Sequence, residues 1–599
     1  MKWHRNTYYA IVLLFMTMLW MHCANPVAPK GGPKDTEPPM VVEADPLNAS
    51  VKFDKDRIVL TFNEFVELKD ARNQVLFSPP LETAPDYRIR GHSVIIRFED
   101  SLRPNTTYNI FFGNAIVDLT EGNPLSGYRY VFSTGDVIDS LSIQGQVLKA
   151  FNLVTEPDVF VMLYLDNNDT LPFDSLPYHV KPAYLGKSTT DGVFSIENLR
   201  DLEYKVFALK DVNNNLLYDL PNEEIAFIDT LVSPEYIKKE VQDTIQPDTL
   251  HPDSTGLEME LADSLEFQTS LPDSLIADTS LIDTIQAKNF LQLLMFNESD
   301  SVQKVLEAKI HDEYSLLFVY AYPPEKVRLE VINHYMDTLN WNIREMSSAK
   351  DTIRLWVKEK PFDTLRFQIS DDTLVLDTVD IVFREKEQKT KDEEGKTPSL
   401  RYKLNATSTI DLDKPLKLTF QYPLLDYDFS SWKLVEKTDT MLTEPVFIDS
   451  ARRKLQIDYP WKEQTSYELI FADSVLKDLS GAMNDSASIR FNSKSLADYG
   501  LLRIRVQMEN ACERYIIQLM NEDESKIFNE RIVDSTSTVI YRFLDPGKYK
   551  LKAICDSRPN GRWDTGDYLK GMQAEAVYYF PKIIDLRANW EIEESWDLK

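Results

Sequence analysis

Residues 58–62 read Ile-Val-Leu-Thr-Phe, and residues 93–98 read Ser-Val-Ile-Ile-Arg-Phe. In both stretches apolar side chains recur at every second position, which is the period of a strand with one buried face. The same alternation returns at 327–331, 354–357 and 365–369, whereas no long window of the sequence has the 3.6-residue period of a helix. The sequence therefore predicts an all-β protein built from many short strands, arranged as β-sandwiches.

The composition restricts the classes of function that the chain can have. Its 599 residues leave room for three to six domains at about 100–200 residues each. The formal net charge of −30 disfavours binding to nucleic acid or to anionic membrane surfaces, because phosphate groups need a basic partner. Hydrophobic residues make up 43% of the chain, which is enough for packed cores, and three cysteines are too few for a disulfide scaffold.

The first 23 residues have the pattern of an export signal. Lys2, His4 and Arg5 precede an apolar run of about 14 residues, which is short for a membrane span of about 20. Cys23 follows this run and resembles the lipidation site of a bacterial lipoprotein. We therefore expect a diacylated Cys23 to anchor the mature chain. The alternatives are a signal peptide cleaved elsewhere and an uncleaved anchor.

Two stretches have the composition of linkers rather than of folded domains. Residues 240–287 contain 11 acidic residues and no Lys or Arg, and Asp followed by Ser or Thr recurs there at intervals of five or ten residues. A five-residue period fits neither helix nor strand, so we expect an extended, self-repelling linker. A second, shorter charged linker is expected at 386–398.

The Asp-Ser/Thr-aliphatic triplets of the acidic linker resemble the O-glycosylation acceptor of Bacteroidetes envelope proteins. A glycosyltransferase needs accessible backbone, which a linker offers. The alternative is that an acidic, Ser/Thr-rich chain contains such triplets through its composition alone. The predicted acceptors are Thr244, Thr249, Ser264, Ser274 and Thr284.

The two halves of the chain repeat the same spacings. A Phe-Tyr-Asp pattern has intervals of 46 and 10 residues in the first half and of 47 and 11 in the second. Its members are Phe62, Tyr108 and Asp118, then Phe420, Tyr467 and Asp478. A Tyr-Lys-aliphatic run followed by Asp, Asn and Asp also occurs twice, at 204–219 and at 549–564. The sequence therefore predicts two modules, each present twice, with a middle module between the copies.

The first repeated module resembles the SbsA-type bacterial Ig-like domain. The residues that carry the resemblance are Pro38-Pro39, Leu60-Thr61-Phe62, Glu64, Thr107-Tyr108, Asp118, Gly122-Asn123 and Phe132-Ser133-Thr134. The second copy lacks the Pro-Pro start and the acidic residue after Phe420, so it is a degenerate match. The other module resembles prealbumin-type sandwiches. The whole chain is similar to Ig-like-domain lipoproteins of Bacteroidetes, which implies an envelope protein with no established catalytic role.

These observations predict tandem Ig-like and prealbumin-like β-sandwiches joined by charged linkers. Sandwiches of about 100 residues are long enough to have cores of their own. The predicted parts are a lipoprotein signal peptide (1–23), a tether (24–37), an Ig-like domain (38–137), a prealbumin-like sandwich (138–237), an acidic linker (238–287), a middle sandwich (288–385), a charged linker (386–398), a degenerate Ig-like domain (399–495), a second prealbumin-like sandwich (496–582) and a C-terminal tail (583–599).

One acidic loop in the first prealbumin-like module is a candidate calcium site. Asp211, Asn213, Asn215 and Asp219 occupy positions 1, 3, 5 and 9 of a calcium-type loop, where hard oxygen ligands converge on one cation. Position 6 is Leu rather than Gly, and position 12 is Asn rather than Glu. The alternative is a turn between strands that is capped by its own side chains.

A second acidic loop repeats this pattern in the last module. Asp556, Asn560 and Asp564 repeat the spacing, but Arg558 stands at position 3, where it would repel a cation. The same alternative of a capped turn applies here. Apart from Ca²⁺ at these two loops, we expect no cofactor.

The sequence lacks the motifs of the common catalytic sites. It contains no HExxH, G-x-S-x-G, P-loop or G-x-G-x-x-G pattern. Cys512 and Cys555 lie near predicted strands of one sandwich and are a candidate disulfide in an oxidising compartment. No His follows His334, so none in the last module could activate either cysteine as a nucleophile. We therefore expect the protein not to be an enzyme.

We interpret the chain as a non-catalytic, multi-domain lipoprotein of the bacterial outer membrane that binds or spaces other envelope components. The lipid on Cys23 is its expected membrane contact, and an envelope protein or glycan is its expected partner. Ala24 and Asn25 follow Cys23 without an acidic cluster, which favours the periplasmic face over the cell surface. The alternatives are an accessory subunit that docks a catalytic or transport partner in the periplasm, and an enzyme of unknown type.

Overall fold

The computed structural model describes residues 34–166, 171–236, 290–298, 302–334, 341–358, 364–383, 399–509 and 512–598. These residues form short strands with only a few helical turns, which are α2 (Ala71–Gln74), η1 (Phe173–Ser175), α3 (Leu176–His179) and η3 (Leu496–Asp498). The predicted all-β class is confirmed. None of the described helices has the length and apolar character of a membrane span. The chain divides into two compact units, residues 1–148 with 155–293 and residues 149–154 with 294–599.

The first sandwich of the first unit has three small sheets, with strand orders β1-β2-β6-β5, β4-β7-β9 and β3-β8. Its strands are β1 (Val41–Asp45), β2 (Arg57–Phe62), β3 (Val66–Leu68), β4 (Leu76–Ser78), β5 (Asp86–Arg90), β6 (Ser93–Arg97), β7 (Thr107–Phe111), β8 (Ile116–Asp118) and β9 (Arg129–Ser133). Leu60, Ile96, Tyr108 and Phe132 face inward and are at most 2% exposed, so the alternation of β2 and β6 marks the core face as predicted.

The second sandwich of this unit has the strand orders β13-β10-β16 and β12-β11-β14-β15. Its strands are β10 (Leu141–Lys149), β11 (Phe160–Tyr164), β12 (Tyr184–Lys187), β13 (Val193–Leu199), β14 (Lys205–Leu209), β15 (Ile225–Phe227) and β16 (Leu291–Met295). All five side chains of β11 and of β14 are buried. These two strands therefore form the centre of the sandwich.

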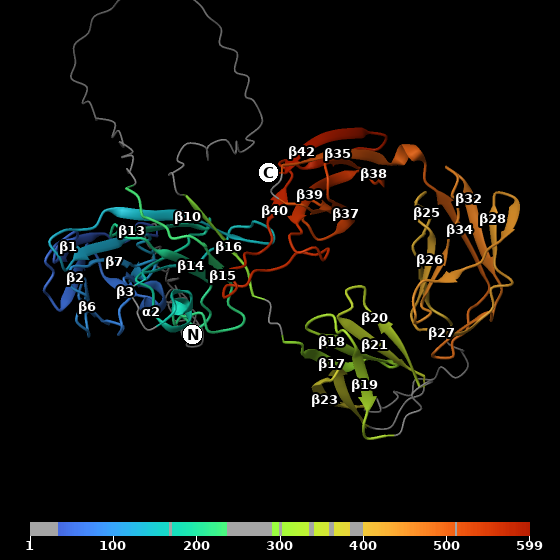
Figure 1. Ribbon diagram of the computed structural model, residues 1–599, viewed down its shortest axis with the longest axis horizontal. Coiled ribbons are helices and arrows are strands. Elements are labelled where there is room, and N and C mark those ends of the chain that lie inside the picture. The colour runs from blue at the N-terminus through green and yellow to red at the C-terminus, as the bar shows by residue number, and fades with distance from the viewer. Residues whose placement is uncertain are drawn as a thin grey trace, which may run out of the picture. The chain divides into compact units, whose positions relative to one another are not determined.

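Strand β16 follows the acidic linker in the sequence but returns to lie beside β10 (Figure 1). The prediction that residues from 288 onward belong to the middle sandwich is therefore wrong for this strand. Leu293 of β16 is fully buried, and the β16 backbone passes so close to β10 that a Cβ at Gly145 would lie 2.3 Å from the Leu291 carbonyl oxygen. The close approach requires glycine at this position of β10.

The two sandwiches of the first unit share buried polar contacts. The Asn109 side chain on β7 donates to the Glu197 carbonyl oxygen on β13 at 3.1 Å. The Leu185 N–H on β12 donates to the Ser78 hydroxyl on β4 at 3.0 Å. Ser78 and Asn109 are at most 1% exposed, so the Ser78 hydroxyl and the Asn109 amide nitrogen find these partners inside the protein rather than in water. These contacts fix the two sandwiches against each other.

The middle sandwich of the second unit pairs two sheets, with strand orders β17-β18-β21-β20 and β19-β22-β23. Its strands are β17 (Val305–Asp312), β18 (Ser315–Tyr320), β19 (Val327–Val331), β20 (Asn342–Met346), β21 (Thr352–Val357), β22 (Thr364–Asp371) and β23 (Leu374–Val382). The predicted alternation at 365–369 puts Leu365, Phe367 and Ile369 in the core, each fully buried.

The degenerate Ig-like domain has the strand orders β24-β26-β31-β30, β25-β34-β32-β28-β29 and β27-β33. Its strands are β24 (Tyr402–Leu404), β25 (Thr409–Ile410), β26 (Leu416–Phe420), β27 (Leu424–Tyr427), β28 (Lys433–Glu436), β29 (Asp439–Leu442), β30 (Val446–Phe447), β31 (Lys454–Ile457), β32 (Ser466–Phe471), β33 (Leu476–Asp478) and β34 (Ala487–Ser493). Its core includes the stacked pair Trp432 and Phe471, with ring centroids 4.5 Å apart.

The last sandwich has the strand order β38-β35-β42 in one sheet and β37-β36-β39-β40 in the other, with β41 also on β39. Its strands are β35 (Gly500–Met508), β36 (Tyr515–Asn521), β37 (Ile527–Val533), β38 (Ser537–Leu544), β39 (Gly547–Cys555), β40 (Val577–Tyr579), β41 (Ile584–Leu586) and β42 (Glu591–Leu598). The predicted C-terminal tail at 583–599 is wrong, because β42 pairs in parallel with β35 and buries Trp596 and Leu598.

The repeated tyrosines found in the sequence have the same role in both copies of each module. In the Ig-like domains the Tyr108 and Tyr467 hydroxyls accept the N–H five residues upstream, at 2.8 and 2.9 Å. In the prealbumin-like sandwiches the Tyr204 and Tyr549 hydroxyls donate to the carbonyl four residues upstream, at 3.1 and 2.6 Å. A buried tyrosine needs such a partner for its hydroxyl, so each ring is held in one orientation.

Candidate functional site

The first acidic loop connects β14 to β15 and is organised around Asp211. One carboxylate oxygen of Asp211 accepts the Asn214 N–H at 2.6 Å, and the other accepts the Leu216 N–H at 2.7 Å. Asn214 and Leu216 have φ values of 58° and 62°, in the left-handed region. The Asp211 carboxylate therefore holds a turn whose backbone is locally strained, especially at Leu216.

The other predicted residues of this loop meet at Asp219. The Asn213 and Asn215 amides donate to the two Asp219 carboxylate oxygens at 3.0 and 2.7 Å. Glu223, which is fully buried, accepts the N–H groups of Val212, Asp219 and Leu220, each at 3.1 Å. Glu223 was not among the residues predicted from the sequence. Its one signal is an acidic residue 12 positions after Asp211, just outside the calcium-type pattern.

The second acidic loop connects β39 to β40 and repeats this construction. Asp556 accepts the Asn560 N–H at 3.0 Å and the Gly561 N–H at 3.2 Å, and the Asn560 amide donates to Asp564 at 2.6 Å. Glu575 takes the place of Glu223. It accepts the N–H groups of Arg558 and Asp564 at 3.1 and 3.0 Å. Glu575 was not among the predicted residues either, and it lies 19 residues after Asp556, whereas Glu223 lies 12 after Asp211.

The two loops differ in the charges that face their carboxylates. In the second loop Arg514 Nε lies 2.9 Å from Asp556, and Arg558 Nε lies 3.6 Å from Asp564 and 3.7 Å from Glu575. In the part of the chain that the structure describes, no Lys or Arg forms an ion pair with the corresponding carboxylates of the first loop. Arg562 Nε also lies 3.5 Å from Asp564, so three guanidinium groups stand beside the carboxylates of the second loop.

Carboxylate and amide oxygens are the ligands that Ca²⁺ prefers. As placed, however, the side chains of both loops satisfy the backbone and one another, which is the capped turn that the sequence left open. Among the described residues, no three or more His, Cys, Asp and Glu side chains form a group that could hold a metal ion. Calcium binding at Asp211–Asp219 stays a prediction.

A disulfide joins Cys512 to Cys555 at the end of β39, directly before Asp556. The Cα atoms of the two cysteines are 5.8 Å apart, within the range for disulfides. Both cysteines are at most 9% exposed. The bridge ties the start of the second acidic loop to the segment that leads into β36.

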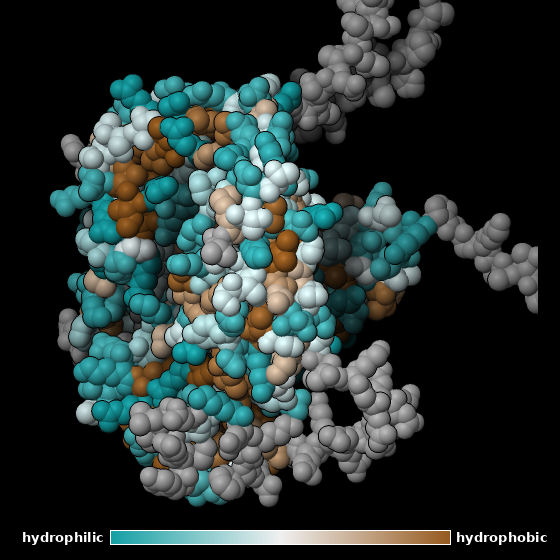
Figure 2. Space-filling view, turned by 90° about the vertical axis from the view of Figure 1, so that its right-hand side faces the viewer, coloured by the Kyte–Doolittle hydropathy of each residue, from teal (hydrophilic) through white to brown (hydrophobic). Residues whose placement is uncertain are grey.

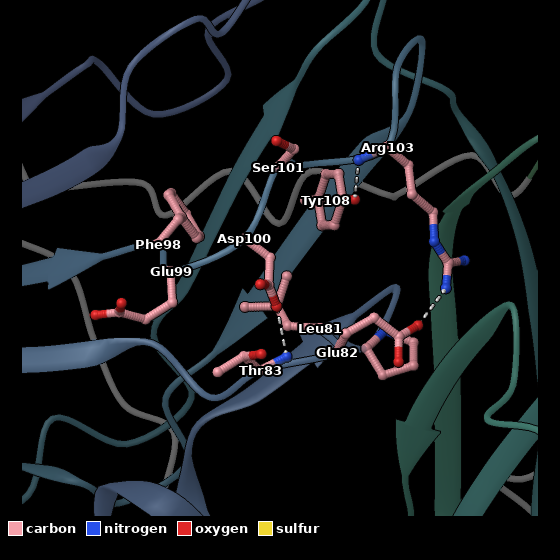
Figure 3. A pocket seen from close by; sticks show the side chains of 10 residues that line it. Leu81, Glu82, Thr83, Phe98, Glu99, Asp100, Ser101, Arg103 and Tyr108 are labelled. Atoms are coloured by element: carbon pink, nitrogen blue, oxygen red, sulfur yellow. Dashed lines mark hydrogen bonds and ion pairs between the residues drawn. The ribbon is translucent and has the colours of Figure 1, made fainter.

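The first Ig-like domain has a small surface hollow next to Tyr108, shown in Figure 3. Its volume is about 40 Å³, which is room for only a few water molecules. Asp100 already accepts the Thr83 N–H at 2.9 Å, and the Tyr108 hydroxyl accepts the Arg103 N–H. These four lining groups are therefore paired with one another, and burial raises the pKa of Tyr108. We assign no ligand to this hollow.

Several predicted site residues lie outside the described residues. They are the lipidation candidate Cys23 and the glycosylation candidates Thr244, Thr249, Ser264, Ser274 and Thr284. The predictions for these residues, and for the linkers that contain them, stay predictions.

A family model described as a bacterial Ig-like domain matches residues 35–134. These residues form a bacterial Ig-like domain. The match ends where β9 ends and covers the strands β1 to β9 described above. The rest of the chain lies outside the match. A search of curated proteins gives no match.

Three solved structures have a weak likeness to the chain. The Bacillus anthracis TIE protein is 9% identical, with 95% of this chain and 76% of that chain covered and a TM-score of 0.14. The S-layer protein rSbsC(31-844) is 10% identical, with 86% and 65% covered and a TM-score of 0.12. Bacteroides ovatus SGBP-B, solved with a mixed-linkage heptasaccharide, is 8% identical, with 75% and 91% covered and a TM-score of 0.17. At these TM-scores we draw no argument from the likeness.

Proposed function

We propose that the protein is a lipid-anchored, non-catalytic protein of the bacterial envelope, whose tandem sandwiches bind or space other envelope components from the periplasmic face of the outer membrane. The observation that carries the proposal is the tandem arrangement itself. Separate hydrophobic cores are centred on residues such as Leu60, Phe367, Leu418 and Leu551. A chain of independently packed β-domains supplies length and surface rather than one deep pocket.

The surface of the protein supports a binding role. On the face shown in Figure 2, hydrophobic residues form small patches that are separated by hydrophilic ones. Patches of this kind, when rimmed by polar residues, are typical of surfaces that contact other macromolecules. The high negative charge keeps such a chain soluble and away from anionic lipid headgroups.

The anchor is tested by replacing Cys23 with Ala in the full chain. We expect wild-type protein to begin at Cys23 and to partition into detergent, because two acyl chains give stable anchoring at about 0.8 kcal/mol per buried methylene. Cys23→Ala should release a soluble chain or leave an uncleaved precursor. The control is the double variant Cys512→Ser/Cys555→Ser, which removes the other two cysteines and should partition like wild type. Unchanged processing and partitioning of Cys23→Ala would contradict the proposal.

Protease treatment of intact cells tests the side of the membrane. Residues 240–287 are the expected first cleavage site. If the chain lies on the periplasmic face, we expect this segment to be protected in intact cells and to be cleaved once the outer membrane is permeabilised. Cleavage in intact cells would place the chain on the cell surface.

A further inference from the structure

Inside the second unit, the outer face of the middle sandwich packs directly against the degenerate Ig-like domain. Trp356 on β21 is 1% exposed, and its indole N–H donates to Glu345 at 2.9 Å. Arg453 of the Ig-like domain forms an ion pair with Glu345 at 2.8 Å, and its guanidinium carbon lies 4.8 Å from the Trp356 ring centroid. Tyr422 and Leu479 complete the apolar part of the contact. This surface of the Ig-like domain is therefore a docking surface for another β-sandwich.

Backbone hydrogen bonds identify the corresponding residues of the first Ig-like domain. The Phe420 N–H donates to the Arg453 carbonyl at 2.8 Å, and the Phe62 N–H donates to the His92 carbonyl at 2.9 Å. In the second copy the Leu479 N–H donates to the Pro423 carbonyl, just before β27, at 2.9 Å. In the first copy the Leu119 N–H donates to the Phe65 carbonyl, just before β3, also at 2.9 Å. The corresponding pairs are His92 with Arg453, Leu119 with Leu479, Phe65 with Pro423, and Glu64 with Tyr422.

In the first Ig-like domain this surface is exposed. Leu119 is 59% exposed, whereas its counterpart Leu479 is 6% exposed. Phe65 is 55% exposed, and its ring stands edge-on to the His92 ring with the centroids 4.1 Å apart. Exposed apolar side chains at the place where the second copy docks a sandwich indicate that the first copy docks a partner too.

The charge of the exposed surface is the reverse of that in the second copy. Burial and the nearby carboxylates of Asp118, Asp35, Glu121 and Glu37 raise the pKa of Glu64. Lys69 is the basic residue nearby, beside Gly122. In the second copy, by contrast, Arg453 brings positive charge to an acidic partner residue. A partner of the first copy must therefore bring Lys or Arg, which disfavours a second copy of this chain with its net charge of −30.

We propose that the surface formed by Glu64, Phe65, His92 and Leu119 docks a domain of a separate protein that presents an apolar side chain beside Lys or Arg. The apolar residue packs between Phe65 and Leu119, on the surface where Trp356 packs against Leu479 in the second copy. The basic residue meets Glu64 and its acidic neighbours. This inference does not rest on the lipid anchor, because it follows from the comparison of the two Ig-like domains.

Site-specific photo-crosslinking in the cells that naturally make the protein tests this proposal. The probe is p-benzoylphenylalanine in place of Phe65 in the full chain, and the matched control is the same residue in place of Ile89, which is 45% exposed on β5 of the same sandwich. We expect one discrete protein adduct at position 65, at least tenfold above position 89. The crosslinked peptide should come from another protein and lie beside Lys or Arg.

The charge part of the proposal is tested by adding Glu64→Lys to the chain that carries the probe at position 65. We expect the adduct to fall at least fivefold, with an unchanged circular dichroism spectrum, because Glu64 lies at the surface of the sandwich. Equal crosslinking at positions 65 and 89 would overturn the proposal. So would an adduct to glycan, to lipid or to this chain itself, or an adduct that Glu64→Lys leaves unchanged.

Discussion

The acidic loops of the two prealbumin-like sandwiches have the same hydrogen-bonding pattern but differ in the charged side chains beside it. Each has an Asp after a central strand, an Asn that reaches a second Asp, and a buried Glu that accepts loop N–H groups. The first loop has three carboxylates that form no ion pair with Lys or Arg in the described part of the chain. The second has Arg514, Arg558 and Arg562 beside its carboxylates, together with a disulfide at its base.

The difference shows that the loop adopts the same fold with or without Arg side chains beside its carboxylates. The shared element is the hydrogen bonding of carboxylates to backbone N–H groups, which both copies keep. Only the second copy has guanidinium groups beside these carboxylates. In the first copy the corresponding carboxylates would attract a cation. The predictions below separate what the loops share from what distinguishes them, from the largest expected effect to the smallest.

Removal of the disulfide should destabilise only the last sandwich. Cys512 and Cys555 are 43 residues apart, and a loop of this length gives about 4 kcal/mol of stabilisation in the chain-entropy model. We expect Cys512→Ser/Cys555→Ser to lower the free energy of unfolding of this sandwich by about that amount, measured by urea denaturation with pulse proteolysis and mass detection. The first prealbumin-like sandwich contains no cysteine and is the internal control. Equal loss in both sandwiches would show that they unfold together.

A buried lysine should make the last sandwich pH-dependent. Lys552 on β39, 1% exposed, stands where the first sandwich has Phe207, since each lies three residues after its repeated tyrosine. Burial lowers the pKa of Lys552 to about 8. Between about pH 8 and the usual lysine pKa, the unfolded chain holds a proton that the folded chain has lost. Stability should therefore rise with pH across this window, by up to about 3 kcal/mol.

Urea denaturation at pH 7.5, 9 and 10.5 measures this rise. Lys552→Met, which keeps a long side chain without the charge, should be more stable than wild type at pH 7.5 and should lose the rise. The matched control is Lys548→Met on the same strand, whose side chain is 57% exposed and which should keep the rise. A rise of the same size in Lys552→Met would assign it to another group.

The buried glutamates Glu223 and Glu575 should each stabilise the sandwich that contains them. Glu223→Ala and Glu575→Ala each remove the acceptor of several backbone N–H groups, and we expect each to cost about 2 kcal/mol in its own sandwich. Hydrogen-exchange mass spectrometry of peptides from β14 and β39 measures the local loss. Glu522→Ala is the control, because its exposed ion pair with Lys548 should contribute less than about 0.5 kcal/mol. A loss of stability in only one of the two sandwiches would show that Glu223 and Glu575 do not have the same role.

Calcium should distinguish the loops. We expect Ca²⁺ at ten times its dissociation constant to stabilise the first prealbumin-like sandwich by about 1.4 kcal/mol and to leave the last one unchanged. Asn213→Ala/Asn215→Ala should abolish the stabilisation of the first sandwich by Ca²⁺. Arg558→Asn tests whether the last sandwich becomes stabilised by Ca²⁺ when a guanidinium group is removed from its loop. Isothermal titration of the full chain with CaCl₂ and with MgCl₂ measures binding directly. No heat and no stabilisation with CaCl₂ would leave the capped turn as the whole role of the first loop.

Much of the fold could be predicted from local pattern. Alternation at 58–62 and 93–98 identified two strands, because a half-buried strand needs an apolar residue at every second position. The repeated Tyr and Asp spacings identified the duplicated modules. Within the loops, Asp211 and Asp556 could be found because short acidic side chains favour turns. Glu223 and Glu575 could not, because their distance from the turn differs between the copies.

The sequence by itself determined which segments are strands, which face of each is buried, and where the turns lie, since these depend on neighbours a few residues away. Only the tertiary structure decided which strands meet. It placed β16 beside β10 across the acidic linker, added β42 to β35 and packed Trp356 against Arg453. A strand pattern specifies a buried face but not the partner that buries it. That choice depends on shape and charge contributed by residues far away in the chain.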